Sequence, residues 1–132
     1  MEIEYDLTQP IYLQIMQRVN SRIVRGEFKP GEKLPSIVDA GLEYGVNHNT
    51  VGRVYSEMVR LGILETRRGE GTFVTKNPQM IENLHQTLRD ELLDTFFKEM
   101  ARLGYSNEEI QNAFLAYYQK MIQINAENGA AS

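Results

Sequence analysis

The sequence predicts a mainly α-helical fold with one small β-hairpin, and three observations lead to this fold class. Three helices are indicated before residue 62, the first and third by apolar residues at helical spacing and the second by a capping box. Two short β-prone runs follow, separated by glycines and a glutamate in the stretch RRGEGTFV. From residue 81 onwards, two long helical stripes replace this pattern. We therefore expect an N-terminal winged helix-turn-helix followed by a two-helix C-terminal segment.

The first helix is expected to begin at Pro10, because proline is tolerated in the first turn of a helix. Gly26 is its expected end. Its apolar stripe repeats every four residues and consists of Ile11, Ile15, Val19 and Ile23. The following stretch, EFKPGEKLP at 27–35, is expected to be a connector, since its Pro-Gly pair favours a turn and its last proline prevents helix continuation.

A helix-turn-helix is expected next. Ser36 is a candidate N-cap with Asp39 as its capping-box partner, so a short helix should run to about residue 44. Gly45 breaks this helix, and Asn47 is the next N-cap. The second, longer helix, 47–61, has its apolar spacing at Val51, Val54, Tyr55, Met58 and Leu61. A short helix, a glycine turn and a longer helix form the helix-turn-helix pattern.

The stretch RRGEGTFV (67–74) allows two interpretations, a phosphate-binding glycine loop or a hairpin tip. A phosphate loop connects a strand to a helix and needs further glycines or a Gly-Lys-Ser/Thr ending. Here Gly69 and Gly71 are flanked by strand-like residues on both sides, and no helix follows. The pattern therefore favours a hairpin, or wing, whose Arg67 and Arg68 could contact a polyanion. A solvated turn with two exposed arginines is the alternative.

A domain boundary is expected after residue 76. It divides the chain into residues 1–76, expected to be a DNA-binding domain, and residues 77–132, expected to be a tail for dimerisation or effector binding. Two amphipathic helices are expected there, with Gly104 between them and a capping box at Ser106. Two helices alone cannot bury two apolar stripes. The tail must fold back onto the first domain or pair with a second copy, and we favour a homodimer. The predicted interface is Leu88, Leu92, Phe96, Met100, Phe114, Tyr117 and Met121.

The charge is distributed unevenly. Residues 1–77 carry ten Lys/Arg and ten Asp/Glu, whereas the remainder carries four and eight, which accounts for the whole formal net charge of −4. Segment 47–76 is locally basic, and local charge matters more than the total for contact with a polyanion. The chain has no cysteine and no long apolar run, and its N-terminus lacks the features of a signal peptide. We expect a cytoplasmic protein without membrane contact.

An enzyme or a metal protein is not expected. The chain has two histidines and no cysteine, which excludes Cys-His catalysis and leaves little material for a Ser-His pair. Glu82 and His85 have the Glu-x-x-His spacing of di-iron bundles, but the other tail carboxylates lie off the apolar stripe. We interpret these two residues as surface neighbours and expect neither a metal nor a cofactor.

Four motifs resemble the GntR family of bacterial transcription regulators: PIYLQI (10–15), GEFKPGEKLPS (26–36), GVNHNTVGRVY (45–55) and LETRRGEGTFV (64–74). The short tail is similar to that of the YtrA-type branch. The resemblance implies a dimeric winged-helix regulator, usually a repressor, that binds a palindromic operator. Three positions depart from the family: Val38 replaces a common arginine, Gly41 weakens a helix interior, and His48 stands where proline or arginine is frequent.

Helix-turn-helix geometry directs the start of helix 47–61 into the major groove, where asparagine suits adenine and threonine suits a phosphate or a thymine methyl group. Asn47 could instead be a plain cap. The predicted contacts to double-stranded operator DNA are Ser36, Asn47, His48, Asn49, Thr50, Arg53, Arg67, Arg68, Gly69, Gly71 and Thr72. A winged helix used only for protein–protein contact is the alternative function. A small-molecule effector would find space only at a dimer interface.

Overall fold

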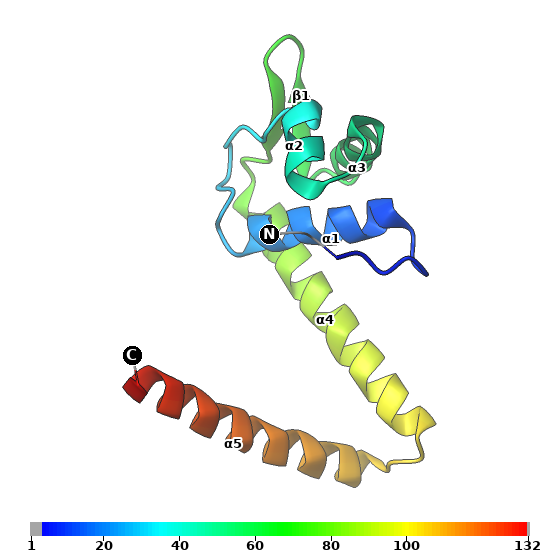
Figure 1. Cartoon of the computed structure of the whole chain (residues 1–132), viewed down its shortest axis with the longest axis vertical. Coiled ribbons are helices and arrows are strands. Elements are labelled where there is room, and N and C mark those ends of the chain that lie inside the picture. The colour runs from blue at the N-terminus through cyan, green and yellow to red at the C-terminus, as the bar shows by residue number, and fades with distance from the viewer. Residues whose placement is uncertain (1–3, 132) are drawn as a thin grey trace. The chain divides into compact units, whose positions relative to one another are not determined.

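The computed structural model describes residues 4–131 and divides into two compact units, residues 1–87 and 88–132. Figure 1 shows the helices and the hairpin in their order along the chain. The elements are α1 (Ile11–Val24), α2 (Ile37–Tyr44), α3 (His48–Arg60), β1 (Leu64–Arg67), β2 (Gly71–Val74), α4 (Pro78–Arg102) and α5 (Asn107–Ala131). Helix α4 begins in the first unit and continues into the second. The predicted winged helix-turn-helix with two further helices is confirmed.

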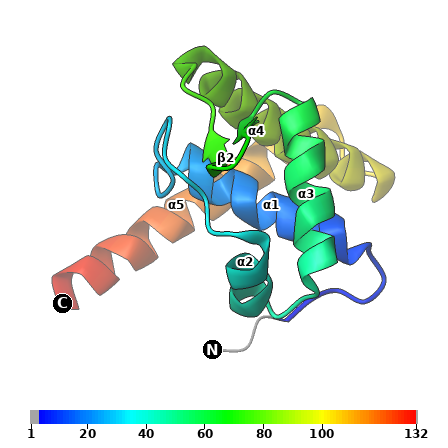
Figure 2. The ribbon, with the colours of Figure 1, turned by 90° about the horizontal axis from the view of Figure 1, so that it is seen from above.

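Helix α3 organises the core of the first unit, because it packs against α1 and α2 (Figure 2) and also against β1. Its buried side chains are those that the helical spacing predicted, except that Leu61 lies past the end of the helix and is exposed. Tyr55 is buried, and its hydroxyl donates a hydrogen bond to the carbonyl oxygen of Pro35 at 2.9 Å. Burial raises the pKa of Tyr55, so the phenol stays neutral and keeps this donor.

The expected caps of the helix-turn-helix are present. The backbone N–H of Asp39 donates to the Ser36 hydroxyl at 3.1 Å, and that of Asn49 donates to the side-chain oxygen of Asn47 at 2.8 Å. Gly45 ends α2 in the left-handed conformation, with φ of 69°, which glycine adopts without steric cost. These caps fix where α2 stops and where α3 starts.

Gly41 has a packing role that its sequence context does not reveal. It is buried in α2, and its carbonyl oxygen accepts a hydrogen bond from the N–H of Val46 at 2.9 Å. A Cβ added at Gly41 would lie 2.9 Å from the carbonyl oxygen of Val46 and 3.3 Å from the backbone nitrogen of His48. The turn therefore approaches α2 so closely that only glycine fits.

We expect Gly41→Ala to destabilise the protein by about 1–3 kcal/mol, because backbone atoms of the turn must move to admit the methyl group. Gly52→Ala is the matched control in α3. A Cβ there meets only the Ile37 Cδ1 atom at 3.9 Å, an ordinary contact. The control should gain about 1 kcal/mol from helix propensity. Urea denaturation of both variants checks this, and equal gains for the two would disprove the close approach.

The wing consists of the predicted hairpin and of a connector segment that pairs with it. Strands β1 and β2 pair antiparallel, with Leu64 opposite Val74 and Arg67 opposite Gly71. The end of the connector extends this sheet along the other edge of β2. The N–H of Leu34 donates to the oxygen of Thr72 at 2.8 Å, and a bridge pairs Lys33 with Phe73. The end of the connector, predicted as a plain turn region, is therefore held against β2 by an isolated bridge and backbone hydrogen bonds, while the sheet formed by the described residues has two strands.

The turn between α4 and α5 carries the predicted capping box in reciprocal form. The N–H of Ser106 donates to the carboxylate of Glu109 at 2.9 Å, and the N–H of Glu109 donates to the Ser106 hydroxyl at 3.2 Å. The pKa of Glu109 is lowered mainly by its hydrogen bond with the Ser106 backbone, and further by its hydrogen bond with the Ser106 side chain. A charged carboxylate at this position also suits the start of α5.

The second unit has almost no core of its own. Within it, Phe96 of α4 meets Phe114 of α5 edge-on, with ring centroids 6.5 Å apart, and Ile110 is its one buried residue among those described. Leu92 is 74% exposed and Phe114 is 49% exposed. So much apolar surface on one pair of helices is typical of an interaction surface. None of the described helices combines the length and the apolar character needed to cross a membrane.

Candidate nucleic-acid interface

The exposed face of α3 opposite the core carries two uncharged polar side chains, Asn49 and Ser56, and two exposed arginines, Arg53 and Arg60. At 100° per residue, all four lie nearly opposite the buried stripe. The two arginines lie beside Asn49 and Ser56 on one flank, and Gly52 lies on the other. We call the uncharged pair the Asn49–Ser56 ridge. Its amide and hydroxyl groups can both donate and accept hydrogen bonds, so they can match the donors and acceptors of base edges.

At the start of α3, three consecutive side chains, those of Asn47, His48 and Asn49, are exposed, and that of Asn47 caps the helix. The side-chain oxygen of Asn47 is engaged by the N–H of Asn49, and the carbonyl oxygen of Asn47 accepts from the N–H of Thr50 at 3.0 Å. Thr50 is half-buried, whereas His48 and Asn49 are exposed. The capping interpretation of Asn47 is thus confirmed, and His48 and Asn49 are the side chains free to meet a ligand.

Arg53 lies on the flank of the ridge that faces α1. Its guanidinium is stacked over the Tyr12 ring, 3.7 Å from the centroid, above an open hollow that Met16 and Arg60 also line. Arg60 is held by the carboxylate of Glu57, with Nε donating at 3.0 Å. Arg53 lies four residues after Asn49 on the same exposed side of α3, and its stacking on Tyr12 directs the guanidinium towards α1. A cation there can reach a phosphate beside the ridge.

The opposite flank of the ridge opens into an uncharged hollow of about 370 Å³ between α3, the start of α2 and the wing. Thr66 and Thr72 form a cross-strand pair on the same sheet face as the buried Leu64–Val74 pair, so they face α3. Ser36, the α2 cap, directly precedes Ile37 at the edge of this hollow. The structure thus brings Ser36 and Thr72, two of the predicted DNA contacts, beside α3. The lining residues are Ile37, Gly52, Tyr55, Ser56, Val59, Thr66 and Thr72.

The wing carries cations in two different environments. The Arg67 guanidinium stacks over the Phe73 ring at 4.0 Å and lies 4.0 Å from the carboxylate of Glu65. Arg68 is exposed at the tip, beside Gly69. Gly69 and Gly71 have φ angles of 77° and 124°, so the expected need for glycine at this tip is confirmed.

Sequence reasoning missed Lys33, which the paired connector brings to the wing. If a Cβ were added at Gly71, it would lie 2.8 Å from Lys33 Cε. Lys33 is placed there by its backbone pairing with Phe73, 40 residues later in the chain. No local sequence pattern predicts this pairing. With Lys33 included, basic side chains occur towards α1, at Arg53 and Arg60, and on the wing, at Lys33, Arg67 and Arg68. On the wing, Lys33 and Arg67 lie on the sheet face turned away from α3, and Arg68 lies at the tip.

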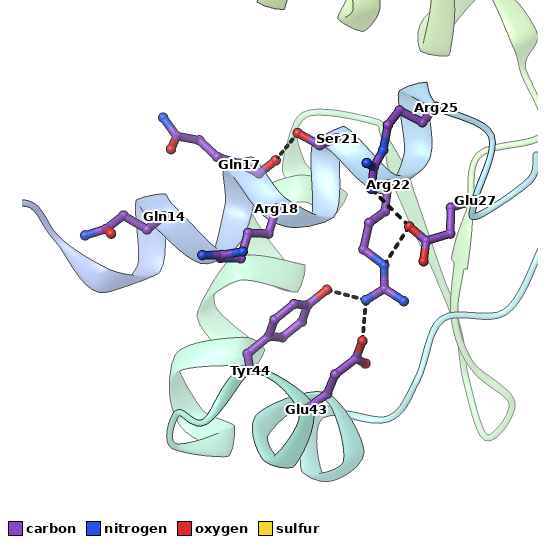
Figure 3. A pocket seen from close by; sticks show the side chains of 9 residues that line it. All are labelled: Gln14, Gln17, Arg18, Ser21, Arg22, Arg25, Glu27, Glu43 and Tyr44. Carbon is purple, nitrogen blue, oxygen red and sulfur yellow. Dashed lines mark hydrogen bonds and ion pairs between the residues drawn. The ribbon is translucent and has the colours of Figure 1, made fainter. Parts of the chain in front are cut away.

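A separate polar hollow of about 520 Å³ lies between α1 and α2 (Figure 3). Arg22 projects into it and donates to the Tyr44 hydroxyl at 2.7 Å and to the Glu43 carboxylate at 2.8 Å, and its Nε lies 3.2 Å from Glu27. Its guanidinium also lies 4.2 Å from the centroid of the Phe28 ring. These contacts engage Nε and one terminal nitrogen of the guanidinium, so we interpret Arg22 as a clamp between α1 and α2. None of the predicted DNA contacts lies here.

No group of three or more His, Cys, Asp or Glu side chains within residues 4–131 could hold a metal ion. Glu82 and His85 are exposed on the first turns of α4. The Glu82 carboxylate accepts a hydrogen bond from the Gln86 amide at 3.1 Å, which is an ordinary contact on a helix surface.

Comparison with known proteins agrees with this geometry. Residues 11–74 match the model described as "Bacterial regulatory proteins, gntR family". The uncharacterized HTH-type transcriptional regulator YhcF of Bacillus subtilis is 44% identical over 83% of this chain and 91% of its own length. The HTH-type transcriptional repressor YtrA of the same organism is 35% identical over 70% of this chain and 72% of its own.

Solved structures give the same result. A GntR family transcriptional regulator from Listeria monocytogenes superimposes with a TM-score of 0.79 at 33% identity, covering 88% of this chain and 98% of that one. The DNA-binding domain of AraR in complex with operator ORR3 superimposes with a TM-score of 0.50 at 27% identity, over 57% of this chain and 90% of that one. The chain therefore belongs to the GntR family and is a bacterial DNA-binding transcription regulator with relatives of the YtrA type.

Proposed function

We propose that the chain binds a palindromic operator as a homodimer and acts as a repressor. Each copy places α3 in a major groove and the wing, residues 67–72, at the adjacent groove. The observation that carries this proposal is the uncharged Asn49–Ser56 ridge with cations towards α1 and on the wing. A recognition surface needs this layout, because bases lie at the centre of a groove and phosphates lie along its two edges.

Individual roles follow from the chemistry of the side chains. Asn49, and His48 beside it, meet base edges, and asparagine can pair with the N6 and N7 atoms of adenine. Arg53 and Arg68 contact phosphates on opposite sides of the groove, which positions the ridge without reading sequence. Ser36 and Thr72 approach the backbone from the rim of the hollow beside Gly52.

The dimer is supported by the second unit, whose apolar side chains are mostly exposed in a single copy. A twofold dimer presents two recognition helices, so its binding site should be a palindrome whose half-sites are spaced by about one helical turn or a multiple of it. YtrA of Bacillus subtilis is named a repressor, and this supports the same sign of regulation here.

Selection from randomised duplex DNA at moderate salt tests the proposal. Sequencing of the retained fraction should show a palindrome with two half-sites, which reports DNA recognition and dimer symmetry together. Retention without enrichment would contradict sequence-specific binding. An absence of retention at low salt would favour a winged helix that contacts proteins instead, because phosphate contacts strengthen as salt is lowered.

A further inference from the structure

The wing obtains a third cation from the connector. Opposite residues of an antiparallel pair point to the same face of a sheet, so the Lys33–Phe73 bridge places the Lys33 side chain on the face of Phe73. In the register of the hairpin, Phe73 shares this face with Glu65 and Arg67. Lys33 and Arg67, 34 positions apart in sequence, thus supply basic side chains to one face of the wing.

The Lys33 side chain lies across Gly71, the first residue of β2. A Cβ built on Gly71 would come within 2.8 Å of Lys33 Cε and 3.6 Å of Lys33 Nζ. Gly71 therefore leaves the space through which the lysine passes, in addition to adopting its own positive φ of 124°. Because Gly71 is paired with Arg67, the lysine ammonium group lies at the same level of the wing as Arg67.

Lys33 is exposed and takes part in no ion pair among the residues that the structure describes. Arg67 differs, because it is stacked on Phe73 and lies 4.0 Å from a Glu65 carboxylate oxygen. An uncompensated ammonium group beside a hairpin tip is a group that a phosphate can neutralise. A solvated lysine is the common alternative, but here a glycine makes room for its stem.

We infer that Lys33 contacts a phosphate of the DNA backbone beside the wing, and that Gly71 is the residue that lets it reach that position. This inference rests on the proposed function, since it assigns a further contact within the same interface. Lys33 contributes position and affinity rather than sequence specificity, because a phosphate is the same beside every base pair.

The test is Lys33→Gln, measured by fluorescence anisotropy with the selected palindrome between 50 and 200 mM salt. Each copy in the dimer then neutralises one phosphate fewer, so the slope of log affinity against log salt should fall by about 2. Extrapolated from equal binding at 1 M salt, the affinity at 0.1 M salt should fall roughly 60-fold. Lys33→Arg should keep most of the slope, and Gly71→Ala should lower it by displacing the lysine.

Lys29→Gln is the matched control, because Lys29 is an exposed lysine of the same connector and precedes the paired segment. It should leave the slope unchanged. A Lys33→Gln variant that behaves like this control would overturn the inference while leaving the proposed function intact. Failure of the wild-type protein to bind any palindrome would instead refute the proposed function, and this inference with it.

Discussion

Charged substitutions at Leu92 and Phe114 are expected to produce monomers and to abolish high-affinity operator binding. Leu92 is largely exposed in the single copy, so its substitution removes little burial from an isolated chain. Phe114 is only half exposed, and its substitution also removes the edge-on contact with Phe96. In the proposed dimer, the same positions lie within the apolar surface between copies. A charge placed there must lose its hydration without gaining a partner, which strongly opposes association.

The expected loss of operator affinity is large because the two recognition helices act together. When one half-site is bound, the other helix is held near its own half-site at a high effective concentration, and this linkage contributes about 10²–10⁴-fold to affinity. A monomer retains its ridge and wing but loses this factor. Sedimentation velocity measures the oligomeric state, and anisotropy with whole and half operators measures the coupling.

Asn112→Glu provides the control, since it adds a charge to α5 on the side away from the apolar arc. It should remain dimeric and bind normally. A wild-type protein that sediments as a monomer would refute the dimer directly. Monomeric variants that still bind the full palindrome tightly would show instead that the dimer exists but does not create operator affinity.

The fold could be predicted from the sequence because the residues that begin and end its helices act on neighbouring residues. Ser36 and Asn47 cap helices through backbone groups two or three residues away, and Gly45 ends α2 through its own φ angle. The reciprocal capping box at Ser106 and Glu109 is equally local. Such features depend on spacing alone, and spacing can be read directly from the chain.

The features that sequence reasoning missed depend on contacts between distant segments. Lys33 joins the wing only because the connector pairs with β2, and Arg53 turns towards α1 because the Tyr12 ring is there to receive it. Gly41 looked like a weak helix residue, yet the turn at Val46 requires it. The arrangement of cations around the Asn49–Ser56 ridge therefore had to come from the structure.

Replacing Arg67 and Arg68 together with glutamine is expected to give the largest electrostatic effect of any change in the wing. Because each copy then neutralises two phosphates fewer, the salt slope should fall by about 4 and the affinity at 0.1 M salt by roughly three to four orders of magnitude. Arg89→Gln in α4 is the control, because it removes one exposed arginine charge from outside the winged helix.

The single variants separate two roles for the wing arginines. Arg68 has no stacking partner in the described structure, so its loss should reduce the slope by about 2 and leave folding unchanged. Arg67 stacks on Phe73, so its loss should also lower the melting temperature of the protein, because the hairpin loses this contact. Equal slopes for wild type and the double variant would show that the wing does not meet phosphates. Binding would then have to depend on α3 and the α1 flank alone, where Arg53 is the exposed cation nearest the ridge.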